Sequence, residues 1–128
     1  MGMMQMSISP WRVLKKENAA LVVEAMHLHT SFGEQIYALA QHASATGEPI
    51  VRPMAYEYPD EGMESLTEQF MLGSNILVAP VVHKNAKEIS VHLPKGKWIG
   101  WNGVCYDGGC MLKITVSLKD TPYFTKID

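Results

Sequence analysis

Apolar side chains between residues 16 and 45 recur every three or four positions, which is the spacing of one face of an α-helix. Glu17 in the first turn and Gly47 just after the last turn fit the helix dipole and the C-terminal capping preference. We therefore predict one long helix of about 45 Å. Gly33 costs about 1 kcal/mol relative to alanine inside a helix and is the candidate position of a bend or break. The apolar face consists of Leu21, Ala25, Leu28, Phe32, Ile36, Leu39 and Ala43.

The remainder of the chain carries short apolar or alternating runs, which are typical of β-strands. The run 50–56 contains a proline and follows another, so it is predicted to be an edge strand or a bent segment. The run 76–82 has no polar alternation, which predicts a strand covered on both faces. Beyond Val82 the pattern predicts an antiparallel meander. The strands are expected at 50–56, 69–72, 76–82, 88–93, 98–101, 104–106, 111–118 and around 123–124.

These elements predict a mainly β fold with one long N-terminal helix, in which the strands form an antiparallel β-sandwich. The segment 1–14 is also rich in apolar residues and has almost no charge before Arg12. A free surface arm rarely carries so much apolar material, so this segment and the helix face are both expected to pack against something.

Composition limits the classes of function. With 128 residues the chain is too short for a complete (β/α)8 barrel, which needs about 250. The balance of 11 basic and 13 acidic residues gives no electrostatic reason to expect nucleic acid or an anionic membrane as a partner. No signal-peptide pattern and no apolar run of about 20 residues is seen. With two cysteines, too few for a disulfide framework, we expect a cytoplasmic protein.

No metal site and no cofactor are predicted. His27 and His29 are two residues apart on the predicted helix, so they point in different directions and cannot share a metal ion. Cys105 and Cys110 lack the second pair of ligands that a zinc site requires.

Four motifs in fixed order carry a family resemblance: GEPIVRPM (47–54), YPDEG (58–62), QFMLGSNILVAPVV (69–82) and HLPKGKWIGWNG (92–103). Together they resemble the C-terminal part of glycoside hydrolase family 31, the α-glucosidase and α-xylosidase group, over roughly residues 4–124. The resemblance implies that residues 1–47 are the end of a catalytic barrel and residues 48–128 a C-terminal β-domain. The expected partner is the rest of that barrel, from an upstream segment or a separate chain, or else a second copy of this chain.

The resemblance also implies candidate sugar-binding residues. The family's matching N-terminal stretch lines the sugar site, and many members have an arginine and a histidine where this chain has Gln5 and Ser7. In the shorter members with a Q-x-S-x-x-P-W run, which this chain resembles, Gln5 and Ser7 would bind sugar hydroxyls and Trp11 would supply an apolar face. The alternative is that all three are packing and turn residues.

The implied activity is hydrolysis of O-glycosidic bonds of α-linked sugars with retention, in carbohydrate metabolism. The family's two catalytic aspartates lie on barrel loops upstream, and no motif of the W-x-D-M-N-E type occurs here, so no catalytic residue is predicted and the isolated chain is expected to be inactive. Glu57, Asp60, Glu61 and Glu64 are interpreted as a solvated loop. The alternative function is a non-catalytic β-sandwich module that binds a protein, or carbohydrate through Trp98 and Trp101.

Overall fold

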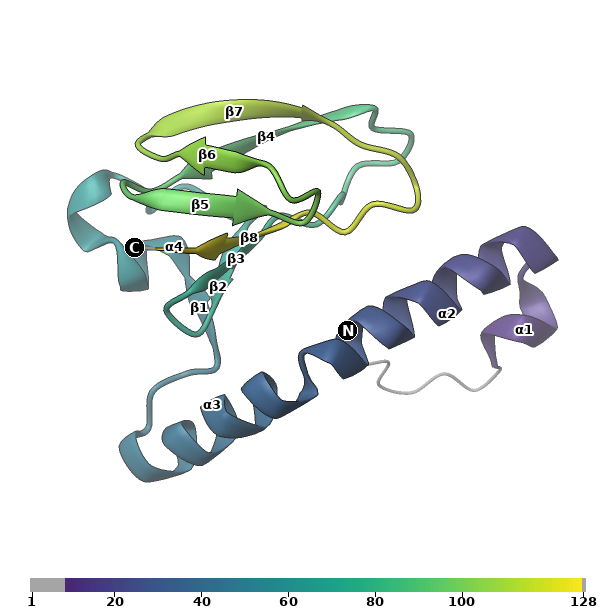
Figure 1. Cartoon of the computed structure of the whole chain (residues 1–128), viewed down its shortest axis with the longest axis horizontal. Helices are drawn as coiled ribbons and strands as arrows, with labels where there is room; N and C mark the ends of the chain where they lie inside the picture. Colours follow the sequence, from purple (N-terminus) through teal and green to yellow (C-terminus); the bar gives the residue numbers. More distant parts are fainter. Residues whose placement is uncertain (1–8, 128) are drawn as a thin grey trace. The chain divides into compact units, whose positions relative to one another are not determined.

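The computed structural model describes residues 9–127 and divides the chain into two compact units, residues 1–46 and 47–128. The first unit is helical and the second is mainly β (Figure 1). Each unit is described by itself below.

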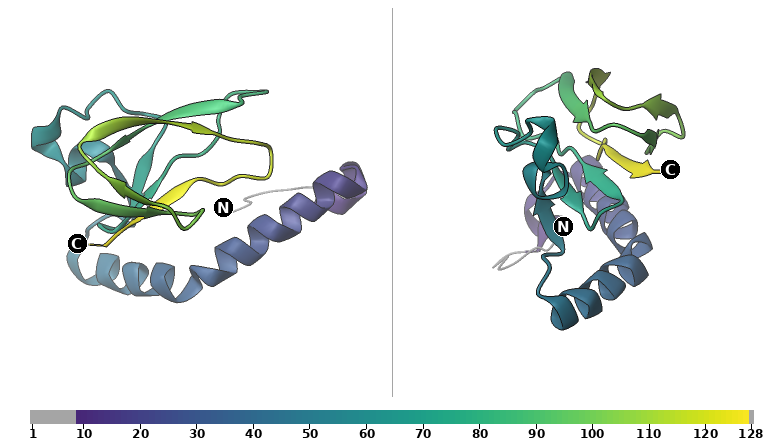
Figure 2. Two further views of the ribbon diagram at one scale, coloured as in Figure 1. Left: turned by 45° about the horizontal axis from the view of Figure 1, so that its top comes forward. Right: turned by 90° about the vertical axis from the view of Figure 1, so that its left-hand side faces the viewer.

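The helical unit contains three helices where one long helix was predicted. They are α1 (Pro10–Val13), α2 (Lys16–Ser31) and α3 (Gly33–Thr46). The predicted helix breaks at Phe32, one residue before the glycine that was its candidate position, and both views in Figure 2 show the change of direction. The hydroxyls of Thr30 and Ser31 donate to the carbonyls of Met26 and Leu28, at 2.9 and 2.6 Å. Such side-chain bonds compete with the helical ladder and bend helices, and glycine adds its low helix propensity.

No side chain of α2 or α3 is buried. Every residue of the predicted apolar face is half-buried, and among the described residues of this unit only Pro10 is buried. Further large apolar side chains are exposed: Trp11, Val13, Leu14, Val23, Met26 and Tyr37. The helical unit therefore leaves much apolar surface uncovered.

The β unit consists of two antiparallel sheets. The larger sheet has the strand order β1-β2-β3-β8-β5-β6, and β4 pairs with β7 in the smaller one. Between β1 and β2 the chain forms the short helices α4 (Met54–Glu57) and η1 (Pro59–Glu61). The strands are β1 (Val51–Pro53), β2 (Phe70–Leu72), β3 (Ile76–Val78), β4 (Glu88–Leu93), β5 (Lys97–Gly100), β6 (Cys105–Asp107), β7 (Cys110–Thr115) and β8 (Tyr123–Lys126).

Two predicted strands are shorter than expected. The run 50–56 forms the edge strand β1, as predicted, but the strand ends at Pro53, which cannot donate to a ladder, and the chain turns there into α4, where the Tyr58 N–H donates to the Met54 carbonyl at 2.9 Å. The run 76–82 forms a strand only at Ile76–Val78. The predicted meander is wrong, since β4 pairs with β7 while β5 lies between β8 and β6 in the other sheet. Neighbouring runs in sequence thus lie in different layers.

The two sheets form a β-sandwich around one core. The small sheet contributes Val91, Leu93, Ile114 and the following Val116, and the large sheet contributes Met71, Leu77, Trp98 and Phe124. Ile76 and Leu77 are adjacent in β3 and both buried, which confirms that this strand is covered on both faces. The strand alternation predicted for 88–93 is also confirmed, with Val91 and Leu93 buried.

Gln69 joins the two sheets through its side chain. It lies just before β2, and its amide nitrogen donates to the His92 carbonyl at 2.8 Å while its amide oxygen accepts from the His92 N–H at 2.9 Å. The buried side chain therefore acts as one more strand residue beside β4 and satisfies backbone groups that would otherwise be unpaired at that edge.

Candidate functional site

The predicted sugar-binding residues are only partly described. Gln5 and Ser7 lie outside residues 9–127, so their roles stay predictions. Trp11 lies in α1, where Pro10 occupies the first helical turn, and 59% of its surface is exposed. An exposed indole offers a flat apolar face with a polar edge, which is the surface that stacks against a sugar ring or packs on a partner.

Three acidic residues in and beside the loop, Glu57, Glu61 and Glu68, each contact a different partner. Glu57 pairs with Arg52, and the Glu61 carboxylate accepts from the Lys95 N–H at 3.3 Å. Glu68 pairs with His83 at 2.8 Å, and both side chains are exposed. These contacts join loops and short helices of the β unit to one another and to β1, which is a structural task, while Asp60 and Glu64 are exposed. None of these acidic residues is assigned a catalytic role.

The most organised charged group in the described structure surrounds Arg52. This residue is on β1, where it pairs with Met71 of β2, and only 6% of it is exposed. Its Nε donates to the Pro49 carbonyl and its Nη2 to the Glu48 carboxylate, both at 2.8 Å. Its Nη1 donates to the Glu57 carboxylate.

The electrostatics of this group keep the guanidinium charged. The hydrogen bond from Arg52 to Glu57 raises the pKa of the guanidinium, and burial opposes it. The Tyr56 ring also lies 5.6 Å from the guanidinium carbon, close enough for a cation–π contact. A permanently charged group with this many fixed partners has no proton to exchange and serves to position backbone.

Sequence reasoning did not single out the Arg52 group. Its signal was present, because Glu48 lies four residues before the arginine in the first family motif and Glu57 lies five residues after it, just before the second motif. A spacing of four residues brings side chains together on a helix. Here the three residues lie on the connection, on β1 and on α4, so the two carboxylates reach the guanidinium only in the folded domain.

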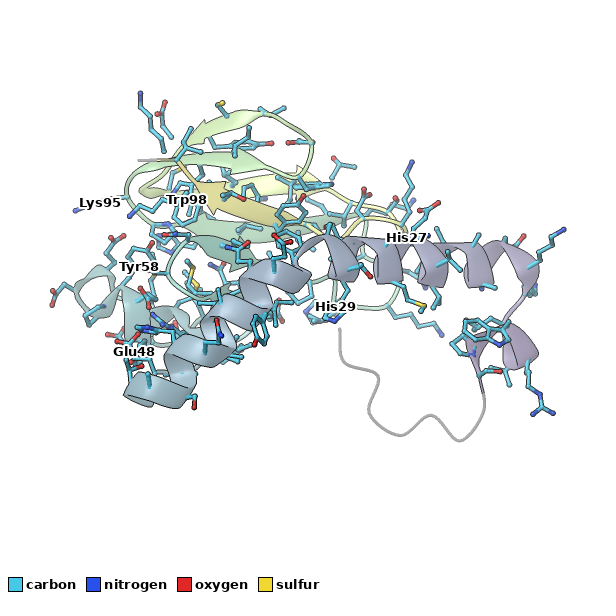
Figure 3. All side chains as sticks on the ribbon, turned by 60° about the horizontal axis from the view of Figure 1, so that its bottom comes forward. His27, His29, Glu48, Tyr58, Lys95 and Trp98 are labelled. Atoms are coloured by element: carbon cyan, nitrogen blue, oxygen red, sulfur yellow. The ribbon has the colours of Figure 1, made fainter. Side chains whose placement is uncertain are left out.

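The alternative carbohydrate platform formed by Trp98 and Trp101 is not present. Trp98 is fully buried, and its indole N–H donates to the Pro94 carbonyl at 2.9 Å (Figure 3). Trp101 packs edge-on against Phe124, with ring centroids 5.8 Å apart. Both rings are parts of the sandwich, and the buried one cannot contact a sugar unless the core opens.

Three further features concern candidate chemistry. His27 and His29 lie on different sides of α2 (Figure 3), and within residues 9–127 no three potential ligands come together to hold a metal ion. Cys105 and Cys110 are exposed free thiols. In the part of the chain that is described, no helix has the length and apolar character needed to cross a bilayer.

The hydrogen bonds of Asp120, in the loop between β7 and β8, lower the pKa of its carboxyl. Its Oδ2 accepts from the Ser117 hydroxyl at 2.6 Å and from the Ser117 N–H at 2.7 Å. The bond from the hydroxyl is the main cause that lowers the pKa of this carboxyl. The pair closes the loop between β7 and β8.

The described chain is thus an antiparallel β-sandwich domain preceded by helices, and its buried charged group is structural. Residues 47–128 match the profile of the family described as the glycosyl hydrolase family 31 C-terminal domain. The chain belongs to glycoside hydrolase family 31.

Relatives and solved structures agree with this membership. The isomaltosyltransferase of Sporosarcina globispora is 37% identical over 92% of this chain and 11% of its own length. Alpha-glucosidase 2 of Bacillus thermoamyloliquefaciens is 31% identical over 91% of this chain and 15% of its own length. A family 31 dextranase of Flavobacterium johnsoniae, solved with isomaltotriose, superposes with a TM-score of 0.87 at 32% identity, over 94% of this chain and 15% of that one. The chain therefore spans a small fraction of the length of the proteins it matches.

Proposed function

We propose that this chain works as the C-terminal part of a larger α-glycosidase that cleaves O-glycosidic bonds of α-linked sugars with retention. The observation that carries the proposal is the match of residues 47–128 to the family's C-terminal domain, together with the small share of each relative that the chain covers. The names of the relatives support an α-glucoside-type substrate, since they include an alpha-glucosidase and a dextranase. The two carboxylates that retention requires would come from the catalytic barrel.

In this proposal residues 1–47 complete the barrel and residues 48–128 form the β-domain that braces it. The exposed apolar residues of the helices support a partner at this surface, because isolated proteins rarely leave so many uncovered. Gln5 and Ser7 would bind sugar hydroxyls in the assembled site. Trp11 has the exposure needed to contribute an apolar face. The exposed free thiols support a reducing, cytoplasmic compartment.

The incompleteness of the chain is tested by activity. We expect the purified chain to show no turnover of aryl α-glucosides, α-xylosides or α-galactosides, and turnover above a heat-treated control would contradict the proposal. The barrel is tested by extending the chain with any in-frame coding sequence upstream of Met1. The extended protein should hydrolyse at least one of these substrates, and Trp11→Ala in it should lower kcat/KM.

A second copy of this chain, bound through the helical unit, is the alternative partner for the same surface. Light scattering separates the two, because a second copy would give a dimer at micromolar concentration whereas a barrel partner leaves the isolated chain monomeric or prone to nonspecific aggregation. A well-defined dimer that persists on dilution would favour self-association.

A further inference from the structure

The segment between α3 and β1, residues 47–50, makes contacts with the β-domain along most of its length. Gly47 follows α3 and has a φ of +82°, a left-handed conformation that favours glycine. Glu48 and Pro49 are bound by the Arg52 side chain, and the Ile50 carbonyl accepts from the Gly73 N–H at 2.8 Å. From residue 48 onward, therefore, this connection makes specific contacts with the β-domain, although it is not yet part of a strand. Figure 3 labels Glu48 in this segment.

We infer that Arg52 is a positioning residue that extends the ordered body of the β-domain back to Glu48. The guanidinium fork suits this task because its nitrogens reach three partners at once. Two of them, the Pro49 carbonyl and the Glu48 carboxylate, belong to the connection. The third, Glu57, belongs to α4 inside the domain. This inference does not depend on the proposed glycosidase activity, since every residue in it belongs to this chain.

The two carboxylates have separable roles. The Glu57 side chain is 16% exposed and the Glu48 side chain is 43% exposed. Removing the charge of Glu57 leaves the buried guanidinium paired only with the more solvated carboxylate, which weakens the domain. Removing the charge of Glu48 leaves the Arg52–Glu57 pair intact and loosens only the start of the connection, at residue 48.

The test uses the full chain labelled with 15N and measures backbone order parameters beside the melting temperature of the β-domain. In the parent protein the amides of Glu48 and Ile50 should have order parameters of about 0.85, the value of rigid backbone. In Glu48→Gln the order parameter at residue 48 should fall to about 0.6 or lower, the flexible range, with the melting temperature unchanged. Ile50 should stay ordered in this variant, because its carbonyl still accepts from the Gly73 N–H. Glu57→Gln should lower the melting temperature. Glu88→Gln, which removes one charge from the exposed pair with Lys113, is the matched control and should change neither quantity.

An unchanged order parameter at residue 48 in Glu48→Gln would overturn the inference. It would also be overturned if Glu48→Gln lowered the melting temperature as much as Glu57→Gln, because the two carboxylates would then have the same role in stabilising the domain. Arg52→Met should release the connection and weaken the domain together. If that variant does not fold, Arg52→Lys replaces it, since lysine keeps the charge but cannot hold three partners, and it should release the connection while retaining the fold. An ordered connection in Arg52→Lys would count against a role for the guanidinium fork.

Discussion

The two units of the chain bury their apolar residues to very different extents. The β unit closes a core in which Trp98 and Phe124 are fully buried, whereas no residue of α2 or α3 is buried. The helices also carry a continuous apolar face, so the difference does not come from a lack of apolar residues in the helical unit. Two sheets can enclose a core between them, but a pair of consecutive helices with one shared apolar face needs a second surface. The comparison teaches that the β unit encloses a hydrophobic core of its own, whereas the described residues of the helical unit do not.

Substituting one phenylalanine in each unit should give the largest contrast. Phe124→Ala removes a fully buried ring in contact with Trp101 and Tyr106 and should cost about 3–5 kcal/mol in the free energy of unfolding. Phe32→Ala removes a ring that is only half-buried and should cost less than about 1 kcal/mol. Denaturant unfolding followed by tryptophan fluorescence measures both. Similar losses in the two variants would mean that the helical unit has a core of its own.

Loss of the Gln69 side-chain bonds between the two sheets should have the next largest effect on stability. Gln69→Leu keeps the size of the side chain but leaves the N–H and the carbonyl of His92 without their partner, at a cost of about 1–3 kcal/mol for each buried group left unsatisfied. The same unfolding curves would report it. Thr67→Val, two residues earlier at an exposed position, is the control and should lie within about 0.5 kcal/mol of the parent. A neutral Gln69→Leu would show that water can replace the amide at this edge.

Substituting the glycine at the break between α2 and α3 should increase helix content, in contrast to the destabilising substitutions above. Gly33→Ala places a methyl group where no neighbour lies within 4 Å, and alanine favours helix over glycine by about 1 kcal/mol. We therefore expect more helical signal in far-ultraviolet circular dichroism and no loss of stability. Gly108→Ala is the contrasting glycine of the β unit, because its methyl carbon would lie 1.8 Å from the Pro94 oxygen, and it should destabilise that unit. Tolerance of Gly108→Ala, or a loss of stability in Gly33→Ala, would contradict this packing difference between the two glycines.

Local patterns predicted much of this fold. The alternation at 88–93 predicted β4 with its correct bounds and inward residues, and the predicted runs 69–72 and 104–106 located β2 and β6 to within one residue at each end. The order of strands in the sheets was not predictable from the same patterns, since pairing depends on which edges meet after the loops have folded. Helical periodicity located α2 and α3, and the low helix propensity of Gly33 marked the candidate break to within one residue. The hydroxyl bonds at Thr30 and Ser31, which also bend the helix, are invisible to an apolar repeat.

The candidate site was less predictable than the fold. Trp11 was singled out from a motif, and its exposure in α1 leaves it available for the proposed role, but nothing local in the sequence indicates what it meets. Arg52 was passed over, since its partners converge only when β1, the preceding connection and α4 are all in place. Trp98 was considered as a ligand platform, whereas its burial and its bond to Pro94 assign it to the core. Burial, which decides between such roles, is a property of the whole fold.

The smallest expected effect is an acid-sensitive loop in the β unit. Hydrogen bonds from Ser117 lower the pKa of Asp120 in the folded protein, so the folded state binds fewer protons than the unfolded state near this pKa. The resulting stabilisation is complete above the unfolded value of about 3.9 and is lost as the pH falls through the lower folded value. Ser117→Ala removes the main cause of the shift, so the Asp120 carboxyl resonance should titrate at a higher pH in this variant than in the parent protein. The stability difference between the two should be present at neutral pH and shrink as the pH falls below about 3.9. A difference that grows on acidification would have the wrong sign for a lowered folded pKa, and would show that Asp120 stabilises the β unit through its protonated form.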